Sequence, residues 1–278
     1  MIIPDPYELT PIEEVDGLFL KRDDLYKLGY VNGGKLRQAV YLMSKAVQNG
    51  AENFLTAASY LSPQIPVVST VANALGKPLF AFMGRKPETF ESSPYALITL
   101  GNGTIVKYYR NCPRSSALYA RVREYAKTLN NPNILLQGIS CFDDRDYFKL
   151  LAHQVENCPD ADNLLVVCGS STNAIGILAG IKKFKKRYNR VILFGVAPNR
   201  EKLIYRTGKS LELDLARFEY VDAYSDLDGY QYEKTYREAI GDIQLHPRYE
   251  AKAYRWFRQS GITGKTLFWI VGGEIGVR

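Results

Sequence analysis

The strongest candidate for covalent chemistry in this chain is a lysine that follows two glycines. The segment Asn32-Gly33-Gly34-Lys35-Leu36-Arg37 precedes apolar residues at i, i+3, i+4 spacing, and Gly50 stands where a helix would end. Lys35 is therefore expected in the first turn of a helix, where the helix dipole opposes a second positive charge and lowers the amine pKa. Because a neutral amine attacks aldehydes, we interpret Lys35 as a Schiff-base lysine. The alternative is a surface lysine after a loop.

A second pattern is typical of a phosphate cradle. An apolar run, residues 164–168, is followed by small and hydroxyl residues and then by a helical pattern. Small residues let backbone amides close around an oxyanion, and the helix N-terminus adds positive potential. The alternative is a plain turn with a serine cap. The residues of this loop are Gly169, Ser170, Ser171, Thr172 and Asn173.

Alternating strands and helices must position these two segments. Such alternation predicts the α/β class, with parallel sheets covered by helices in a two-lobed three-layer α/β/α arrangement. We expect a larger lobe from residues 1–44 and 141–278, and a smaller inserted lobe at 45–140. The expected strands are 53–57, 79–83, 104–109, 133–137, 164–168, 191–196 and 267–271. The expected helices are 67–75, 116–129, 147–157, 174–187, 233–240 and 250–259, with a poorly patterned segment at 198–230.

Composition bounds the class of protein. The chain has 278 residues, of which 46% are hydrophobic and 23% charged, as in an ordinary globular protein. We expect it to be cytoplasmic, because it shows neither a signal peptide nor a membrane-length apolar run. Four scattered cysteines and two histidines predict reduced thiols and no metal site.

The net charge is +7 and the isoelectric point is about 9.1, which points weakly to an anionic partner. Much of the excess lies between residues 182 and 190. Such a run is more often a solvated helix end than a nucleic-acid contact.

The order of these segments resembles the fold-type-II family of pyridoxal-phosphate (PLP) enzymes, which includes the tryptophan synthase β chain. The narrower resemblance is to the branch of aminocyclopropane-carboxylate deaminase and D-cysteine desulfhydrase. It covers nearly the whole chain. The segments that carry it are Lys21-Arg22-Asp23-Asp24-Leu25, Gly33 to Arg37, Ser62-Pro63-Gln64, Gly169 to Asn173, Leu245-His246-Pro247-Arg248-Tyr249-Glu250-Ala251-Lys252, and Gly272-Gly273.

The resemblance implies a role for each segment. Lys35 would bind PLP, residues 169–173 would hold its phosphate, and Glu250 would meet its pyridine nitrogen and keep it protonated. Tyr249 and Ser62 would handle protons or substrate, and Ser59 and Gln64 would line the substrate side. The family is commonly dimeric, so a homodimer is expected.

The departures from the family concern the substrate side. Pro63 replaces an asparagine, Pro66 an arginine and Gln38 a lysine, so the grip on a substrate carboxylate looks dismantled. In PLP chemistry the bond that breaks stands perpendicular to the cofactor ring, and a gripped carboxylate is protected. We therefore expect a PLP-dependent lyase that decarboxylates an amino-acid group.

The substrate of this lyase and two alternative activities remain open. The basic surface, together with a chain shorter than is usual for the branch, suggests an amino acid attached to a modified base in phage DNA. The protein would then work in the host cytoplasm. A deaminase or desulfhydrase of a small free amino acid is the alternative within the family. The other alternative is an inactive fold-type-II protein that binds nucleic acid or a partner.

Overall fold

The computed structural model describes residues 1–84, 92–109, 112, 115–215 and 218–275. The chain divides into two compact units. The first unit comprises Met1–Pro6, Lys27–Cys141 and Ile275–Arg278, and the second comprises Tyr7–Tyr26 and Phe142–Glu274. Residues 1–6, residues 27–44 and Ile275 group with the smaller sheet, whereas the expected division places them in the larger lobe. The helix that carries Lys35 packs along the next helix of that unit, which explains the grouping of residues 27–44.

The first unit is built on a four-stranded sheet in which all neighbouring strands are parallel. Its strands alternate side chains between two apolar layers, as strands covered on both faces must. Phe54 pairs with Leu79, and Leu55 pairs with Phe80. In spatial order the strands are β7 (Ile105–Tyr108), β6 (Leu79–Met83), β5 (Asn53–Ala57) and β8 (Pro132–Leu135).

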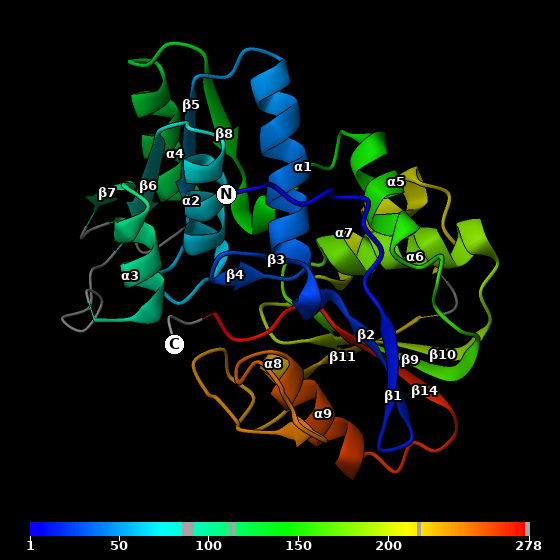
Figure 1. Cartoon of the computed structure of the whole chain (residues 1–278). Coiled ribbons are helices and arrows are strands. Elements are labelled where there is room, and N and C mark those ends of the chain that lie inside the picture. Colours follow the sequence, from blue (N-terminus) through cyan, green and yellow to red (C-terminus); the bar gives the residue numbers. More distant parts are fainter. Residues whose placement is uncertain (85–91, 110–111, 113–114, 216–217, 276–278) are drawn as a thin grey trace. The chain divides into compact units, whose positions relative to one another are not determined.

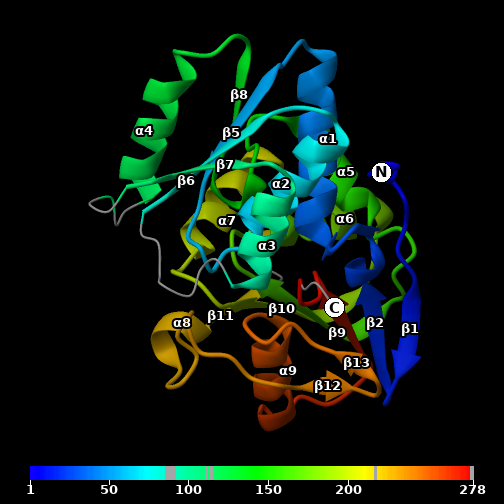
Figure 2. The ribbon, with the colours of Figure 1, turned by 60° about the vertical axis from the view of Figure 1, so that its left-hand side comes forward.

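Helices cover both faces of this sheet (Figures 1 and 2). One face packs Leu55, Phe82 and Val122 into a core with α4 (Ser115–Ala126). The other face is covered by α2 and α3, which bury Ile65 and Ala96. A short hairpin, β3 (Lys27–Leu28) and β4 (Val31–Asn32), leads into α1. The remaining elements are α1 (Gly34–Gln48), α2 (Gln64–Ala74), α3 (Pro94–Gly101) and the 3-10 turn η2 (Gln137–Ile139).

The second unit is built on a six-stranded sheet whose central strands are long apolar runs. Neighbouring strands are parallel except for the antiparallel edge pair β1 and β2. The strands are β1 (Ile12–Val15), β2 (Leu18–Arg22), β14 (Thr266–Ile270), β9 (Ala161–Cys168), β10 (Tyr188–Gly195) and β11 (Phe218–Asp222). The carboxyl ends of β9, β10 and β11 therefore meet at one edge, where ligands bind in open α/β sheets.

Figure 1 shows one helix layer on each face of this sheet. Gly176 and Gly180 let α6 approach α5 closely, because an added Cβ would lie 2.2 Å from Leu151 Cβ or 2.4 Å from Val155 Cγ2. The opposite layer covers a core that includes Leu165, Phe194 and Phe268. The first layer is α5 (Arg145–His153), α6 (Thr172–Phe184) and α7 (Glu201–Ser210); the second is α8 (Ala223–Asp226) and α9 (Glu250–Gln259). The turn η1 (Asp23–Leu25) and the hairpin β12 (Ala239–Ile240) and β13 (Ile243–Gln244) complete the unit.

The expected α/β class with parallel sheets is confirmed. The expected helix at 233–240 is wrong, because that segment is irregular and ends in strand β12. Helix α3 was not expected, nor were α7, β11 and α8 inside the segment that seemed poorly patterned. Within the described residues, no helix is both long and apolar enough to cross a membrane.

Candidate active site

The loop of residues 169–171 joins β9 to α6 at the carboxyl edge of the second unit's sheet. Its neighbour on the sheet is the end of β10, where the Val196 amide donates to the Cys168 carbonyl at 3.0 Å. Ser171 adopts a left-handed conformation with φ of 69° and precedes the first turn of α6. A non-glycine residue rarely takes this conformation, and such strain concentrates at ligand sites. The loop is therefore shaped to turn its backbone sharply into the helix.

The same loop has the chemistry of an anion site. Ser171 is buried, and its Oγ has no hydrogen-bond partner among the described residues other than the buried thiol of Cys168. Ser170 Oγ lies 3.4 Å from Thr172 Oγ1. Free amide groups and the positive end of the helix dipole converge at a helix N-terminus. The loop can thus offer hydroxyl and amide donors to one oxyanion.

Glu250 begins α9 and is buried, at 2% exposure. Its Oε1 accepts hydrogen bonds from the backbone amides of Val271 at 3.1 Å and Gly272 at 3.3 Å. Its Oε2 is buried without a hydrogen-bond partner among the residues that the structure describes. Burial raises the pKa of Glu250 to about 8, and the charge of Asp24 adds to the rise. The fixed carboxyl group therefore leaves one oxygen for an external donor.

Tyr249 connects this carboxyl group with the phosphate-type loop. A Cβ placed on Gly169 would lie 3.9 Å from Tyr249 Cε1, so the glycine and the ring face each other. The hydroxyl groups of Tyr249 and Tyr232 lie 2.6 Å apart. The ring centroid of His246 lies 4.6 Å from that of Tyr249. Burial lowers the pKa of His246 to about 3, so this imidazole is uncharged near neutral pH and packs beside the tyrosine as a neutral ring.

Two side chains of the last helix region hold the backbone that carries Tyr232. Lys252 is fully buried, and its Nζ donates to the carbonyls of Tyr230 at 3.2 Å and Gln231 at 2.6 Å. Arg248 Nε donates to the Tyr232 carbonyl at 3.1 Å. Sequence reasoning missed Tyr232, because it lies in a polar stretch without periodicity. The sequence carries no local signal for Tyr232, because the side chains that hold its backbone are distant along the chain.

Lys35 lies in the first turn of α1 in the first unit, as expected. The preceding Gly33 has φ of 85° and accepts the Arg37 amide at 3.2 Å, which starts the helix. Burial lowers the pKa of Lys35 to about 8. A substantial fraction of this amine is therefore neutral near physiological pH, as a nucleophilic lysine requires.

Ser59 and Ser62 form a tight turn at the carboxyl end of β5 in the first unit. The Ser62 amide donates to the Ser59 carbonyl at 2.9 Å, and Ser62 Oγ accepts the Gln64 amide at 3.3 Å. The Gln64 side chain is buried, and it forms hydrogen bonds with other residues of the first unit. Its Nε2 donates to Thr56 Oγ1 at 2.8 Å, and its Oε1 accepts the Gly138 amide at 2.7 Å. Gln64 therefore supports this turn, whereas the two serine hydroxyls remain at its surface.

The N-terminus of α2 offers few free donors. Pro63 caps the helix and Pro66 lies in its first turn, so two of the first four amide hydrogens are missing. The Gln64 amide is bonded to Ser62, which leaves Ile65. A helix start that could have held a carboxylate is thus largely stripped of donors.

The expected site residues fall into two sets. Lys35, Ser59, Ser62 and Gln64 belong to the first unit, and residues 169–173, Tyr249 and Glu250 belong to the second. Within the second unit the structure brings the loop, the tyrosine and the carboxyl group together. Among described residues, no group of three or more His, Cys, Asp or Glu side chains is arranged to hold a metal, and the four cysteines are free thiols.

Comparison with known proteins shows which sequences and folds this chain resembles. No family model matches the chain. Over an alignment 362 positions long it is 26% identical to an O-seryl-dTMP PLP-dependent decarboxylase of Salmonella phage ViI, covering 96% of this chain and 82% of that protein. Among solved structures, an ACC deaminase homologue matches with a TM-score of 0.80 at 20% identity, covering 99% of this chain and 92% of the other. A pyridoxal 5'-phosphate-dependent aspartate racemase matches with a TM-score of 0.60 at 14% identity, covering 96% and 90%.

Proposed function

We propose that this chain, which has the fold of the fold-type-II PLP enzymes, is a PLP-dependent lyase that removes the carboxyl group of an amino-acid substrate. The phage relative bears the name of such a decarboxylase. The observation that carries the choice of reaction is the donor-poor start of α2, where Pro63 and Pro66 stand.

The side chains fit the cofactor. Glu250 Oε2 is buried without a partner among the described residues, and Ser171 Oγ contacts only the thiol of Cys168, which is a weak hydrogen-bonding group. Both oxygens can therefore bind a group from outside the protein. A pyridine nitrogen suits the first and a phosphate the second. Lys35, with its pKa lowered to about 8, supplies the amine that binds the aldehyde. When bound, PLP acts as an electron sink for the pair of electrons left at the substrate's α carbon.

Side chains and backbone groups of the protein would bind the cofactor and transfer protons. Burial raises the pKa of Glu250, so this carboxyl group can supply a proton to the ring nitrogen, and its free oxygen would then accept the hydrogen bond from the protonated nitrogen. The loop of residues 169–173 anchors the phosphate. Tyr249, hydrogen-bonded to Tyr232, holds a proton beside the loop and can donate it to the carbon that loses its carboxyl group.

The start of α2 decides which bond is exposed. Amide donors at a helix start would hold a substrate carboxylate and favour its retention. Pro63 and Pro66 remove two such donors. The side chain of Gln64 is already hydrogen-bonded to Thr56 and to the Gly138 amide. A substrate carboxylate would then be held by fewer donors at this helix start, which favours its loss as carbon dioxide with the electron pair left at the α carbon.

The substrate that we propose is a seryl group or similar amino acid linked to a thymine nucleotide. Support comes from the name of the phage relative and from the basic charge of this chain. The second candidate function is deamination of a small free amino acid, which the fold similarity to an ACC deaminase homologue favours.

One experiment separates the two reactions. The PLP-loaded protein is given serine labelled with ¹³C in its carboxyl group, either free or linked to thymidine monophosphate. Decarboxylation releases labelled carbon dioxide and leaves an amine, whereas deamination releases ammonia and keeps the label in a 2-oxo acid. Labelled carbon dioxide from the nucleotide-linked serine is the expected result. Ammonia from free serine would replace the proposal with the second candidate.

A further inference from the structure

A basic surface lies at the opposite end of α6 from the loop of residues 169–171. Six of the nine residues from 182 to 190 are lysine or arginine, and we call them the basic cluster: Lys182, Lys183, Lys185, Lys186, Arg187 and Arg190. They occupy the end of α6 and the start of β10, at the amino edge of the parallel strands. The function proposed above uses none of them.

Most of the charge in this cluster is uncompensated. Arg187 pairs with Asp160 at 2.9 Å, and Arg190 pairs with Glu219 at 2.7 Å. None of the four lysines forms an ion pair with a carboxylate among the described residues. Lys182 and Lys186 donate to backbone carbonyls, of Glu212 at 2.5 Å and Cys158 at 2.6 Å, which fixes their position but leaves their charge. The dipole of α6 accounts for one or two cations at its end, but not for four.

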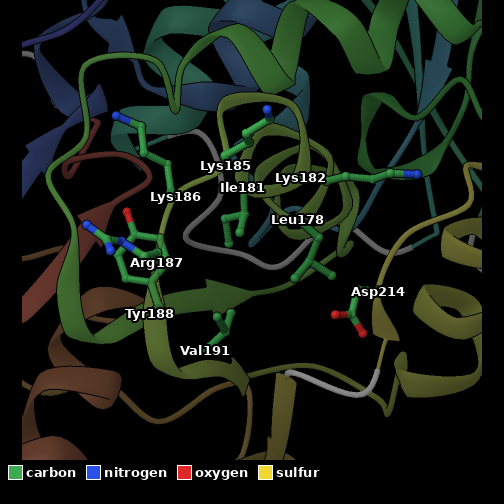
Figure 3. A pocket seen from close by; sticks show the side chains of 9 residues that line it. All are labelled: Leu178, Ile181, Lys182, Lys185, Lys186, Arg187, Tyr188, Val191 and Asp214. Atoms are coloured by element: carbon green, nitrogen blue, oxygen red, sulfur yellow. The ribbon is translucent and has the colours of Figure 1, made fainter.

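A pocket of about 310 Å³ opens between these side chains. Its lining has an apolar part, Leu178, Ile181 and Val191, and the wall includes Tyr188 and Asp214. Figure 3 shows that the ammonium groups of Lys182, Lys185 and Lys186 point in different directions around it. Charges spread in this way suit a series of separated anions better than one compact ion.

We propose that the basic cluster and this pocket bind the sugar-phosphate backbone of DNA flanking the modified base. This inference rests on the proposed function, because it supplies the larger molecule to which the amino-acid group is attached. Lysines without acidic partners displace the counterions condensed on DNA phosphates, and the release of these ions supplies most of the affinity of non-specific DNA binding. The apolar lining accommodates a sugar or a base next to the contacted phosphates.

The distance between the basic cluster and the loop of residues 169–171 sets a minimum length for DNA that reaches both ends of α6. Helix α6 has 13 residues, so its two ends are about 20 Å apart at 1.5 Å per residue. At about 3.4 Å per base pair, roughly six nucleotides span the distance between the two ends of this helix. Substrates with longer flanks should therefore show a lower KM than a mononucleotide, with little change in kcat.

The test measures DNA binding separately from catalysis. Fluorescence anisotropy follows binding of the full-length PLP-loaded protein to an unmodified labelled 20-base-pair duplex over a salt series. The variant K182Q/K183Q/K185Q removes three exposed charges and keeps the bond of Lys186 to Cys158. The matched control K127Q/K234Q/K265Q removes three exposed lysines outside the cluster and lowers the net charge equally.

The cluster variant should bind at least tenfold more weakly at low salt, and its slope of log affinity against log salt should be less steep by about three. The control should bind like the parent protein. Equal weakening in both variants, or no binding by the parent, would overturn the proposal. So would binding to phosphatidylserine vesicles in place of DNA. Carbon dioxide release from the mononucleotide should be unchanged in the cluster variant; loss of that activity in the parent would instead count against the proposed function.

Discussion

The hydroxyl groups of Tyr232 and Tyr249 lie 2.6 Å apart, within the second unit and beside the loop that follows β9. Burial raises the pKa of Tyr232, and the bond to Tyr249 acts in the opposite direction. Lys252 and Arg248 hold the backbone around Tyr232 through its carbonyl groups. The two hydroxyl groups are therefore held in a fixed geometry.

Removing either hydroxyl tests this pair. Tyr249→Phe should lower kcat on the order of 100-fold, because it deletes the proton donor at the reacting carbon. Tyr232→Phe should cause a smaller loss in kcat and shift the pH profile, with cofactor affinity unchanged. Tyr254→Phe, on the same helix as Glu250 but stacked on Phe268, serves as control and should behave like the parent. Steady-state kinetics across pH decide the matter; an unaltered kcat in Tyr249→Phe would remove this tyrosine from the reaction.

The pKa of Glu250 makes a prediction about stability. Its folded-state pKa is about 8, above the ordinary value of 4.5. Between these pH values the folded state keeps a proton that the unfolded state has lost, so stability falls as pH rises. Glu250→Gln cannot ionise, and its Tm relative to the parent should increase from pH 5 to pH 8 in cofactor-free protein. Thermal melts at several pH values measure this difference.

The same variant should lose activity, on the order of 100-fold in kcat, because an amide cannot keep the ring nitrogen protonated. A pH-independent difference in Tm would mean that Glu250 does not titrate as its burial implies. Full activity in Glu250→Gln would show that the carboxyl group is not the partner of the ring.

Two glycines of the second unit differ in how closely other atoms pack against them. An Ala at Gly180 would place its Cβ 2.4 Å from Val155 Cγ2 and 2.5 Å from the Ala152 carbonyl oxygen, where α5 meets α6. Gly180→Ala should therefore lower the free energy of unfolding by about 1 to 3 kcal/mol. At Gly169 the nearest atom is 3.9 Å away, so Gly169→Ala should unfold like the parent. Urea titration compares the two; equal stability would contradict the close packing of these helices.

The start of α2 predicts how the reaction can be redirected. Pro63→Asn restores a backbone N–H and adds a side-chain amide at the cap of this helix. The share of turnovers that release carbon dioxide should fall, and the share that releases ammonia with a 2-oxo acid should rise. Pro78→Asn, at the exposed start of β6, is the matched control. An unchanged product ratio in Pro63→Asn would mean that the donor-poor helix start does not govern the reaction.

The elements that sequence predicts best are those whose pattern is local. Strands β5 and β6 and helix α9 were expected with the observed boundaries, because apolar or amphipathic runs there end at clear breaks. Helix α3 was missed although Ser93 and Pro94 form a typical start signal, since its residues are apolar without a clear helical stripe. In α7 the buried stripe is narrow, consisting of Ile204, Thr207 and Gly208.

Tertiary contacts explain the remaining differences. The segment expected as a helix at 233–240 is preceded by backbone carbonyls that bond to the Lys252 and Arg248 side chains. These bonds replace helical ones, and neither cation is near the segment in sequence. The Tyr232 contact was hidden for the same reason. By contrast, Lys35 and the loop of residues 169–173 were predictable in local structure, because glycine and serine positions at a helix start leave a local pattern.

The attachment of the cofactor to Lys35 is the central claim, and borohydride trapping tests it most directly. The protein is loaded with PLP, reduced and digested, and the peptides are analysed by mass spectrometry. A pyridoxyl group should be found on Lys35 and should be absent in Lys35→Ala, whereas Lys45→Ala on the same helix should label normally. Since burial lowers the pKa of Lys35 to about 8, the rate of cofactor addition should rise with pH and level off above that value. A label on another lysine, or labelling that persists in Lys35→Ala, would contradict the account.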